Sequence, residues 1–287
     1  MKKIALFCLV LLTSTNLWAD KASSSSLKQI DPHSFANFDQ VKITHMALDL
    51  TANFKKKHLE GTNTIRYTML DEQAKYLILD TRDLDIKRIT YISQKKNGVK
   101  KELKAIWQLL KPVDGLGAAL KIKLPESHVD LTIHYESMPQ ASGLQWLSAE
   151  QTAGKKQPFL FSQSQAIHAR SWIPLQDTPS VRITYDANIH TPSDLLAVMS
   201  ADNQPNADRD GAYQFVMPQP IPSYLLAIAV GNIYFAPLGD ETGVYTEPEM
   251  LEASVFEFAD TQTMLETAEA MFGPYRWGRY DMLMLPP

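Results

Sequence analysis

Residues 120–135 read LKIKLPESHVDLTIHY, and this stretch decides the class of fold. In both halves apolar residues alternate with polar ones, as in a strand that buries one face in a core and turns the other to water. Pro125, Glu126 and Ser127 separate the halves with residues that favour turns. The stretch therefore predicts two half-buried strands of an antiparallel sheet. The alternating apolar residues are Leu120, Ile122 and Leu124 in the first half and Val129, Leu131, Ile133 and Tyr135 in the second.

The same alternation recurs on both sides of this stretch. Turn residues such as Asn97-Gly98 and Asp114-Gly115 again separate the alternating segments, as antiparallel sheets require. The pattern predicts a mainly β fold, with an antiparallel N-terminal β domain over residues 28–236. Its apolar positions include Met46, Leu48 and Leu50, then Ile65, Tyr67 and Met69, then Val181, Ile183, Tyr185, Ala187 and Ile189, with further strands expected over 195–199, 213–216 and 224–230.

The C-terminal part has a different pattern. From Glu249 to Phe272 there is no glycine or proline, and apolar residues fall near helical spacing, which predicts one helix. Gly273-Pro274 should end this helix, and residues 280–285 indicate a strand. A new architecture is therefore expected to begin near residue 237. The helical apolar positions are Leu251, Val255, Phe258, Leu265 and Phe272.

Residues 1–19 have the layout of a secretory signal peptide. Lys2 and Lys3 precede an apolar run over 4–12, and Ala19 offers a cleavage site. The run is shorter than the roughly 20 residues that span a bilayer. Residues 20–27, which contain four consecutive serines, indicate a flexible leader. We expect a mature protein without a transmembrane segment or lipid anchor, exported to the periplasm or secreted.

Composition and missing motifs exclude several classes of function. Lys plus Arg number 28 against 32 Asp plus Glu, so there is no excess of cations to bind nucleic acid. The one cysteine, Cys8, lies in the signal, which leaves no thiol in the mature chain. Neither a G-x-S-x-G elbow nor a G-x-x-x-x-G-K-[ST] loop occurs, and no two histidines have H-E-x-x-H spacing. Asp80, Asp83 and Asp85 lack the remaining residues of a calcium loop and are interpreted as part of a solvated loop.

Residues 159–170, FLFSQSQAIHAR, contain the most distinctive polar pattern. Gln163 and Gln165 lie two residues apart in a strand-like run, so their amides should point the same way and could bind a polar ligand. They could equally face solvent, and the residues alone favour that simpler interpretation. His168 has no acidic or histidine partner nearby in the sequence, which is typical of a structural histidine.

Three segments resemble the leukotriene A4 hydrolase type of zinc aminopeptidase, within the wider aminopeptidase N family. They are residues 141–147 (ASGLQWL), residues 159–170 and residues 172–181 (WIPLQDTPSV). The similarity continues through 220–225 and 273–281 and covers essentially the whole chain after the leader. The wider family's pattern is matched by Ala169-Arg170, Pro174 and Asp177-x-Pro179, and the hydrolase branch by Gln163-Ser164-Gln165-Ala166 and Leu144-Gln145-Trp146-Leu147.

The resemblance implies a saddle-like antiparallel β domain followed by the truncated start of a thermolysin-like α/β catalytic domain over 237–287. The segment Gln163–Ala166 would reach into the active-site cleft. There Gln165 would bind the free α-amine and first residue of a peptide, and Gln163 and Ala166 would line the same pocket. With the rest of the catalytic domain absent, the apolar stripe over 249–272 should be exposed.

The resemblance also implies one zinc ion per full-length enzyme, held by two histidines and one glutamate with an open fourth position. The G-x-M-E-N and H-E-x-x-H motifs would lie beyond residue 287, so we expect no catalytic residue and no metal ligand in this chain. Two functions stay open. The chain is the N-terminal portion of an exported zinc aminopeptidase acting on peptides with a free N-terminus, or a non-catalytic β-rich binding module derived from that family.

Overall fold

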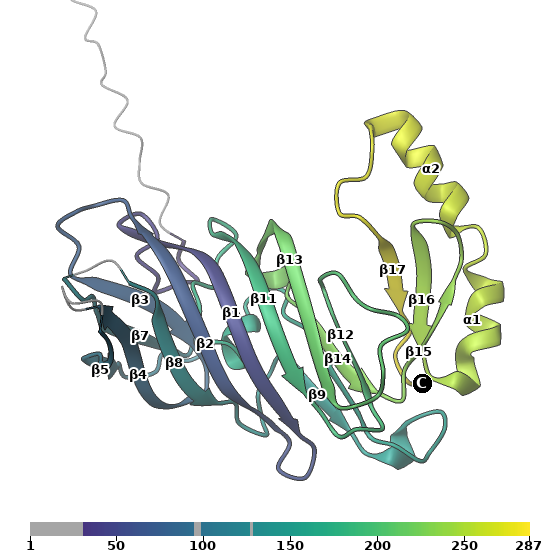
Figure 1. The fold of residues 1–287 in the computed structure, drawn as a ribbon, viewed down its shortest axis with the longest axis horizontal. Helices are drawn as coiled ribbons and strands as arrows, with labels where there is room; N and C mark the ends of the chain where they lie inside the picture. The colour runs from purple at the N-terminus through teal and green to yellow at the C-terminus, as the bar shows by residue number, and fades with distance from the viewer. Residues whose placement is uncertain (1–30, 95–98, 127–128) are drawn as a thin grey trace, which may run out of the picture. The chain divides into compact units, whose positions relative to one another are not determined.

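A seven-stranded sheet forms the largest part of the fold (Figure 1). The computed structural model describes residues 31–94, 99–126 and 129–287, so the predicted signal peptide, the leader and the Asn97-Gly98 turn lie outside the described residues. In spatial order the strands are β13 (Ala212–Pro222), β11 (Arg182–His190), β1 (Val41–Asn53), β2 (His58–Met69), β8 (Leu131–Glu136), β4 (Asp85–Gln94) and β5 (Lys100–Lys104).

The predicted alternation is confirmed in these strands. On β8 the side chains of Leu131, Ile133 and Tyr135 are buried, while the residues between them are partly exposed. The apolar positions predicted on β1 and β11 are buried in the same core. The pairing is antiparallel except between β1 and β11, which run parallel. Parallel neighbours need a crossover connection, and here a long stretch of the chain, including β2 to β10, provides it.

Three smaller sheets complete the described β structure. The first has four strands in the spatial order β12 (Leu196–Met199), β14 (Ile228–Gly231), β10 (Phe159–Ser162) and β9 (Leu144–Leu147). The second has three, β3 (Tyr76–Thr81), β7 (Ala118–Lys123) and β6 (Trp107–Leu109). The third also has three, β15 (Tyr234–Pro237), β16 (Thr242–Thr246) and β17 (Tyr280–Leu283).

The apolar run over 224–230, expected as a strand, instead begins with a 3₁₀ turn at Ser223–Leu225, and the strand starts at Ile228.

The prediction of one helix over 249–272 is wrong in its continuity. A 3₁₀ turn at Pro248–Met250 leads into α1 (Leu251–Glu257), and α2 (Thr261–Phe272) begins after a break. At the break the Thr261 hydroxyl donates to the carbonyl oxygen of Phe258 at 2.7 Å. Threonine and aspartate favour such local bonds over a continuous helix. The helices lie beside the β15–β17 sheet, and α1 contacts β15 and β16 (Figure 1). Two further 3₁₀ turns span Ala149–Gln151 and Ala169–Ser171.

The break also changes which apolar side chains are exposed. Leu265 of the predicted stripe is buried. Phe272 of the stripe is 82 % exposed, as expected. Phe256, Met264 and Met271 do not belong to the stripe, yet they are also exposed, Phe256 to 84 %. A single helical stripe therefore does not describe this surface. Among the described residues, no helix has both the length and the apolar character needed to cross a membrane.

Candidate functional site

The segment Gln163–Ala166 forms a turn directly after β10. The prediction that both glutamines lie in a strand is wrong, because β10 ends at Ser162. The backbone N–H of Gln163 still donates to Gly143 across the sheet at 2.9 Å. One residue later the pattern changes, because the carbonyl oxygen of Ser164 accepts from the N–H of His168 at 2.9 Å. This local bond closes the turn.

Ser164 holds the turn from the inside. Its side chain is buried, and its hydroxyl donates to the carbonyl oxygen of Leu226 at 2.6 Å and accepts from Trp172 Nε1 at 3.2 Å. Gln163, Gln165 and Ala166 are exposed on either side of it. The backbone N–H of Gln165 donates to the side-chain oxygen of Gln163 at 3.2 Å. The turn therefore presents two amides to solvent from a fixed base, as a polar binding site requires.

His168 follows the turn by two residues and is held by Ser142 and Arg82 as a structural residue. Its Nδ1 lies 2.8 Å from the Ser142 hydroxyl and 3.2 Å from Nη1 of Arg82. Because a guanidinium can only donate, Nδ1 acts as an acceptor toward Arg82. Burial lowers the pKa of His168, and the positive charge of Arg82 lowers it further. A neutral, hydrogen-bonded imidazole results, which agrees with the structural role predicted from the sequence.

A buried ionic network follows the turn. Arg170 is fully buried, and its Nε donates to Oδ2 of Asp177 at 2.9 Å. Its Nη2 donates to the carbonyl oxygens of His33 and Asp177, at 2.8 and 3.0 Å. Oδ1 of Asp177 accepts from the Ser223 hydroxyl at 2.6 Å. The network fixes the residues after the turn to segments that are distant in the sequence.

Asp80 is the second carboxylate of this network. The interpretation of Asp80 as part of a solvated loop is wrong, because its side chain is fully buried at the end of β3. It accepts hydrogen bonds from Ser34 Oγ at 2.6 Å, the N–H of Phe35 at 2.7 Å and the N–H of Asp177 at 2.9 Å. Burial raises the pKa of Asp80, and the charge of Arg170, 3.8 Å away, partly offsets this rise.

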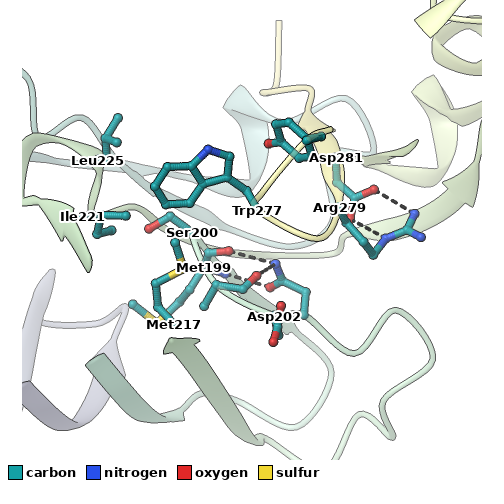
Figure 2. A pocket seen from close by; sticks show the side chains of 12 residues that line it. Met199, Ser200, Asp202, Met217, Ile221, Leu225, Trp277, Arg279 and Asp281 are labelled. Atoms are coloured by element: carbon teal, nitrogen blue, oxygen red, sulfur yellow. Dashed lines mark hydrogen bonds and ion pairs between the residues drawn. The ribbon is translucent and has the colours of Figure 1, made fainter. Parts of the chain in front are cut away.

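A cavity of about 520 Å³ lies away from this turn, between the strands β12 and β13 and the segment before β17 (Figure 2). One side of its lining is apolar, and on the other Arg279 is paired with Asp281 at 2.9 Å. The lining includes none of the residues Gln163–Ala166 and none of the potential metal ligands that cluster within the described residues. The cavity is therefore not part of the predicted site. It is lined by Met199, Ser200, Ala201, Asp202, Asn203, Met217, Ile221, Leu225, Tyr275, Trp277, Arg279 and Asp281.

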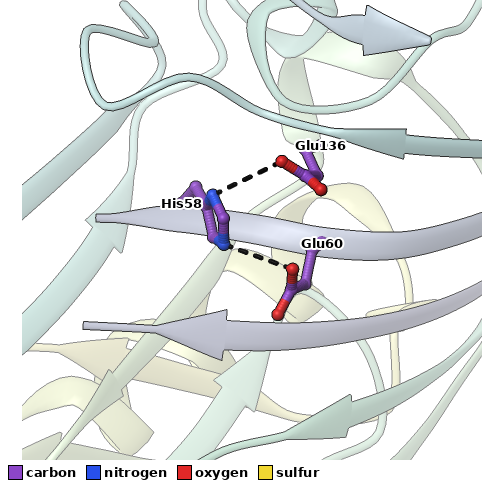
Figure 3. Close-up of side chains that lie close together, drawn as sticks. All are labelled: His58, Glu60 and Glu136. Carbon is purple, nitrogen blue, oxygen red and sulfur yellow. Dashed lines mark ion pairs between the residues drawn. The ribbon is translucent and has the colours of Figure 1, made fainter. Parts of the chain in front are cut away.

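His58, Glu60 and Glu136 form the one cluster of potential metal ligands among the described residues (Figure 3). His58 Nε2 lies 3.4 Å from Oε2 of Glu60, and its Nδ1 lies 3.9 Å from Oε2 of Glu136. This cluster was not predicted from the sequence. The His58-x-Glu60 spacing places two of its members on one strand face, but Glu136 joins them only through the pairing of β2 with β8.

Comparisons with known proteins decide the family. Residues 42–225, more than half of the chain, match the peptidase M1 N-terminal domain. The chain belongs to the M1 peptidase family. This confirms the resemblance read from the sequence, and the matched range contains Gln163–Ala166, Arg170 and Asp177.

The similar proteins carry two names, leukotriene A4 hydrolase and leucine aminopeptidase 2. Leukotriene A-4 hydrolase of Xenopus laevis is 42% identical over 267 residues, which cover 90% of this chain and 42% of that protein. Leucine aminopeptidase 2 of Aspergillus fumigatus is 36% identical over 268 residues, with the same coverage. The solved structure of native yeast leukotriene A4 hydrolase superposes with a TM-score of 0.81 at 35% identity, covering 91% of this chain and 40% of that one. The chain thus spans about two fifths of the length of these M1 relatives.

Proposed function

We propose that the chain is the N-terminal portion of an exported zinc aminopeptidase, and that its turn Gln163–Ala166 forms one wall of the substrate cleft. The observation that carries the proposal is the turn itself, in which buried Ser164 fixes two exposed glutamine amides. Membership in the M1 family supports the peptidase class, and the similarity to leucine aminopeptidase 2 supports peptides as substrates.

The two glutamines have different tasks in this proposal. The side-chain oxygen of Gln163 accepts from the backbone N–H of Gln165, which orients Gln163 along the wall. The side chain of Gln165 makes no hydrogen bond within the described part of the chain, so its oxygen is available to accept from the ammonium group of a peptide. A blocked N-terminus would leave that acceptor unpaired, which disfavours such substrates.

The family's zinc does not fit the described residues. The resemblance calls for two histidines and one glutamate, whereas the one cluster of potential ligands in the described ranges has one histidine and two glutamates. No step of peptide hydrolysis is therefore assigned to these residues. Their part in the proposal is to bind and orient the N-terminal residue of the substrate.

Assays with a free and a blocked substrate test the proposal. We expect the reading frame to continue past the codon for Pro287 into G-x-M-E-N and H-E-x-x-H motifs. The longer protein should hydrolyse an aminoacyl chromogenic substrate, lose activity with a chelator and regain it with zinc, and leave the N-acetylated substrate intact. The 287-residue chain should give no hydrolysis above the blank. A longer product that binds peptides without cleaving them would favour the non-catalytic binding module instead.

Export is tested separately from catalysis. The predicted signal peptide lies outside the described residues, and the proposal rests on the layout of residues 1–19. Mass spectrometry of the exported protein should find an N-terminus at Asp20. A chain that keeps residues 1–19 and stays with the cytoplasmic fraction would remove export from the proposal and leave the peptidase class untouched.

A further inference from the structure

Three carboxylates lie side by side on one part of the large sheet. Glu60 on β2 pairs directly with Glu136 on β8, and Glu136 pairs on its other side with Asp85 on β4. Like charges directly opposite each other destabilise a sheet. Lys87 offers one positive charge, with its Nζ 2.5 Å from Asp85 and 3.3 Å from Oε1 of Glu136. Within the described residues no second Lys or Arg pairs with this row, so two of its three negative charges have no partner besides His58.

His58 lies between the carboxylates of Glu60 and Glu136 (Figure 3). Its side chain is buried, with 6 % of the residue exposed, and within the described residues Nε2 has no hydrogen-bond partner. A neutral imidazole carries one N–H and one lone pair. If Nδ1–H points to Glu136, the lone pair of Nε2 faces an oxygen of Glu60 at 3.4 Å. Two acceptors then face each other across a gap that a cation would fill.

Although the sequence predicts no metal ligand in this chain, we propose that a divalent transition-metal ion of the Zn²⁺ class binds between Nε2 of His58 and Oε2 of Glu60. Two ligand atoms of one tetrahedral zinc ion are about 3.4 Å apart, because Zn–N and Zn–O bonds are about 2.0–2.1 Å long. The two atoms are already 3.4 Å apart. A dication also supplies the two positive charges that the row lacks, whereas a second proton on the ring supplies one.

Glu136 acts in this site as the residue that positions His58. Histidine ligands of metals commonly donate their second N–H to a carboxylate, which fixes the ring. Oε2 of Glu136 faces Nδ1 at 3.9 Å, and Lys87 holds its other oxygen. Glu60 is partly exposed, so water can complete the coordination and the ion can enter from solvent. The imidazole ligand favours zinc over calcium or magnesium.

Equilibrium dialysis of the tag-free 287-residue chain against ZnCl₂, followed by metal analysis, tests the site. We expect one Zn²⁺ per chain in the wild type, and no competition from Ca²⁺. His58→Gln and Glu60→Gln should abolish this binding, and Glu136→Gln should weaken it about 10- to 100-fold. At a free zinc concentration about 100-fold above Kd, the wild-type melting temperature should rise by about 5 °C.

A second histidine–carboxylate pair provides a matched control. His190 Nε2 lies 3.2 Å from Oδ1 of Asp49, but both side chains are exposed and no third ligand joins them within the described residues. His190→Gln should bind zinc like the wild type. Absence of binding in the wild type, binding retained in His58→Gln, or equal loss in His190→Gln would each overturn the proposal. If His58→Gln does not fold, as judged by circular dichroism, the partly exposed Glu60→Gln variant decides.

Discussion

Replacing Arg170 with leucine should lower the free energy of unfolding by about 3–5 kcal/mol, because removing one partner of a buried ion pair leaves charge without compensation. Arg170, Asp80 and Asp177 are all fully buried. In the variant both carboxylates keep their hydrogen bonds to Ser34 and Ser223 but lose the one guanidinium that contacts them within the described residues. Urea denaturation followed by circular dichroism measures the loss.

The exposed pair of Arg66 and Asp130, with side chains 61% and 44% exposed and 3.3 Å apart, provides the control. Arg66→Leu should cost less than about 1 kcal/mol. A similar loss in both variants would mean that the buried network contributes no more than a surface pair.

The pH dependence of the Arg170→Leu deficit has a definite sign. Burial raises the pKa of Asp80, so the folded state holds its proton at a pH where the unfolded chain has released it. Stability from this group is present below the unfolded pKa and is lost as pH rises through the folded pKa. Without the positive charge of Arg170, burial disfavours the ionised form of Asp80 more strongly. The deficit should therefore be smaller in mildly acidic than in neutral solution.

Replacing Gln165 with leucine in the longer, catalytically complete protein should lower kcat/KM about 10- to 150-fold. Leucine keeps the approximate size of the side chain but removes the acceptor proposed for the substrate ammonium, and hydrogen bonds to charged groups contribute about 1.5–3 kcal/mol each. Gln163→Leu should cost less, because Gln163 lines the wall and its oxygen already accepts from Gln165 N–H. Steady-state kinetics with a short peptide measures both.

Two controls make the Gln165 result interpretable. Gln165 is exposed, so Gln165→Leu should melt at nearly the wild-type temperature. Gln108 is an exposed glutamine on β6, and Gln108→Leu should keep wild-type kcat/KM. Unchanged kinetics in Gln165→Leu would return the pair to the interpretation of solvent-facing amides, whereas a large drop in melting temperature would make Gln165 a structural residue.

The parts of the fold that depend on local alternation were predictable from the sequence. Leu131, Ile133 and Tyr135 specify a strand with one buried face, and that is how β8 is built. The same rule misled at Gln163 and Gln165, because buried Ser164 between two exposed residues continues the alternation after β10 has ended. A period of two fits this turn as well as it fits a strand.

The parts that depend on contacts between distant residues were not predictable. Asp80 resembles a solvated carboxylate until Ser34 and the backbone N–H of Asp177 reach it. Glu136 follows His58 by a long stretch of chain and joins it only because β8 pairs with β2 in one particular register. No spacing rule along the sequence encodes a strand register, so these clusters become visible only in the folded chain.

The parallel pairing of β1 with β11 affects the order in which the fold can form. β2 leaves the ribosome directly after β1 and can pair with it at once, but β11 emerges only when residues 182–190 have been made. Until then one edge of β1 has no partner and could pair with another chain. Contacts between segments so distant in sequence form slowly. The nascent chain therefore passes through a period in which β1 is prone to pair with another chain. That period ends when β11 pairs with β1, and the free edge then lies on β11 until β13 pairs with it.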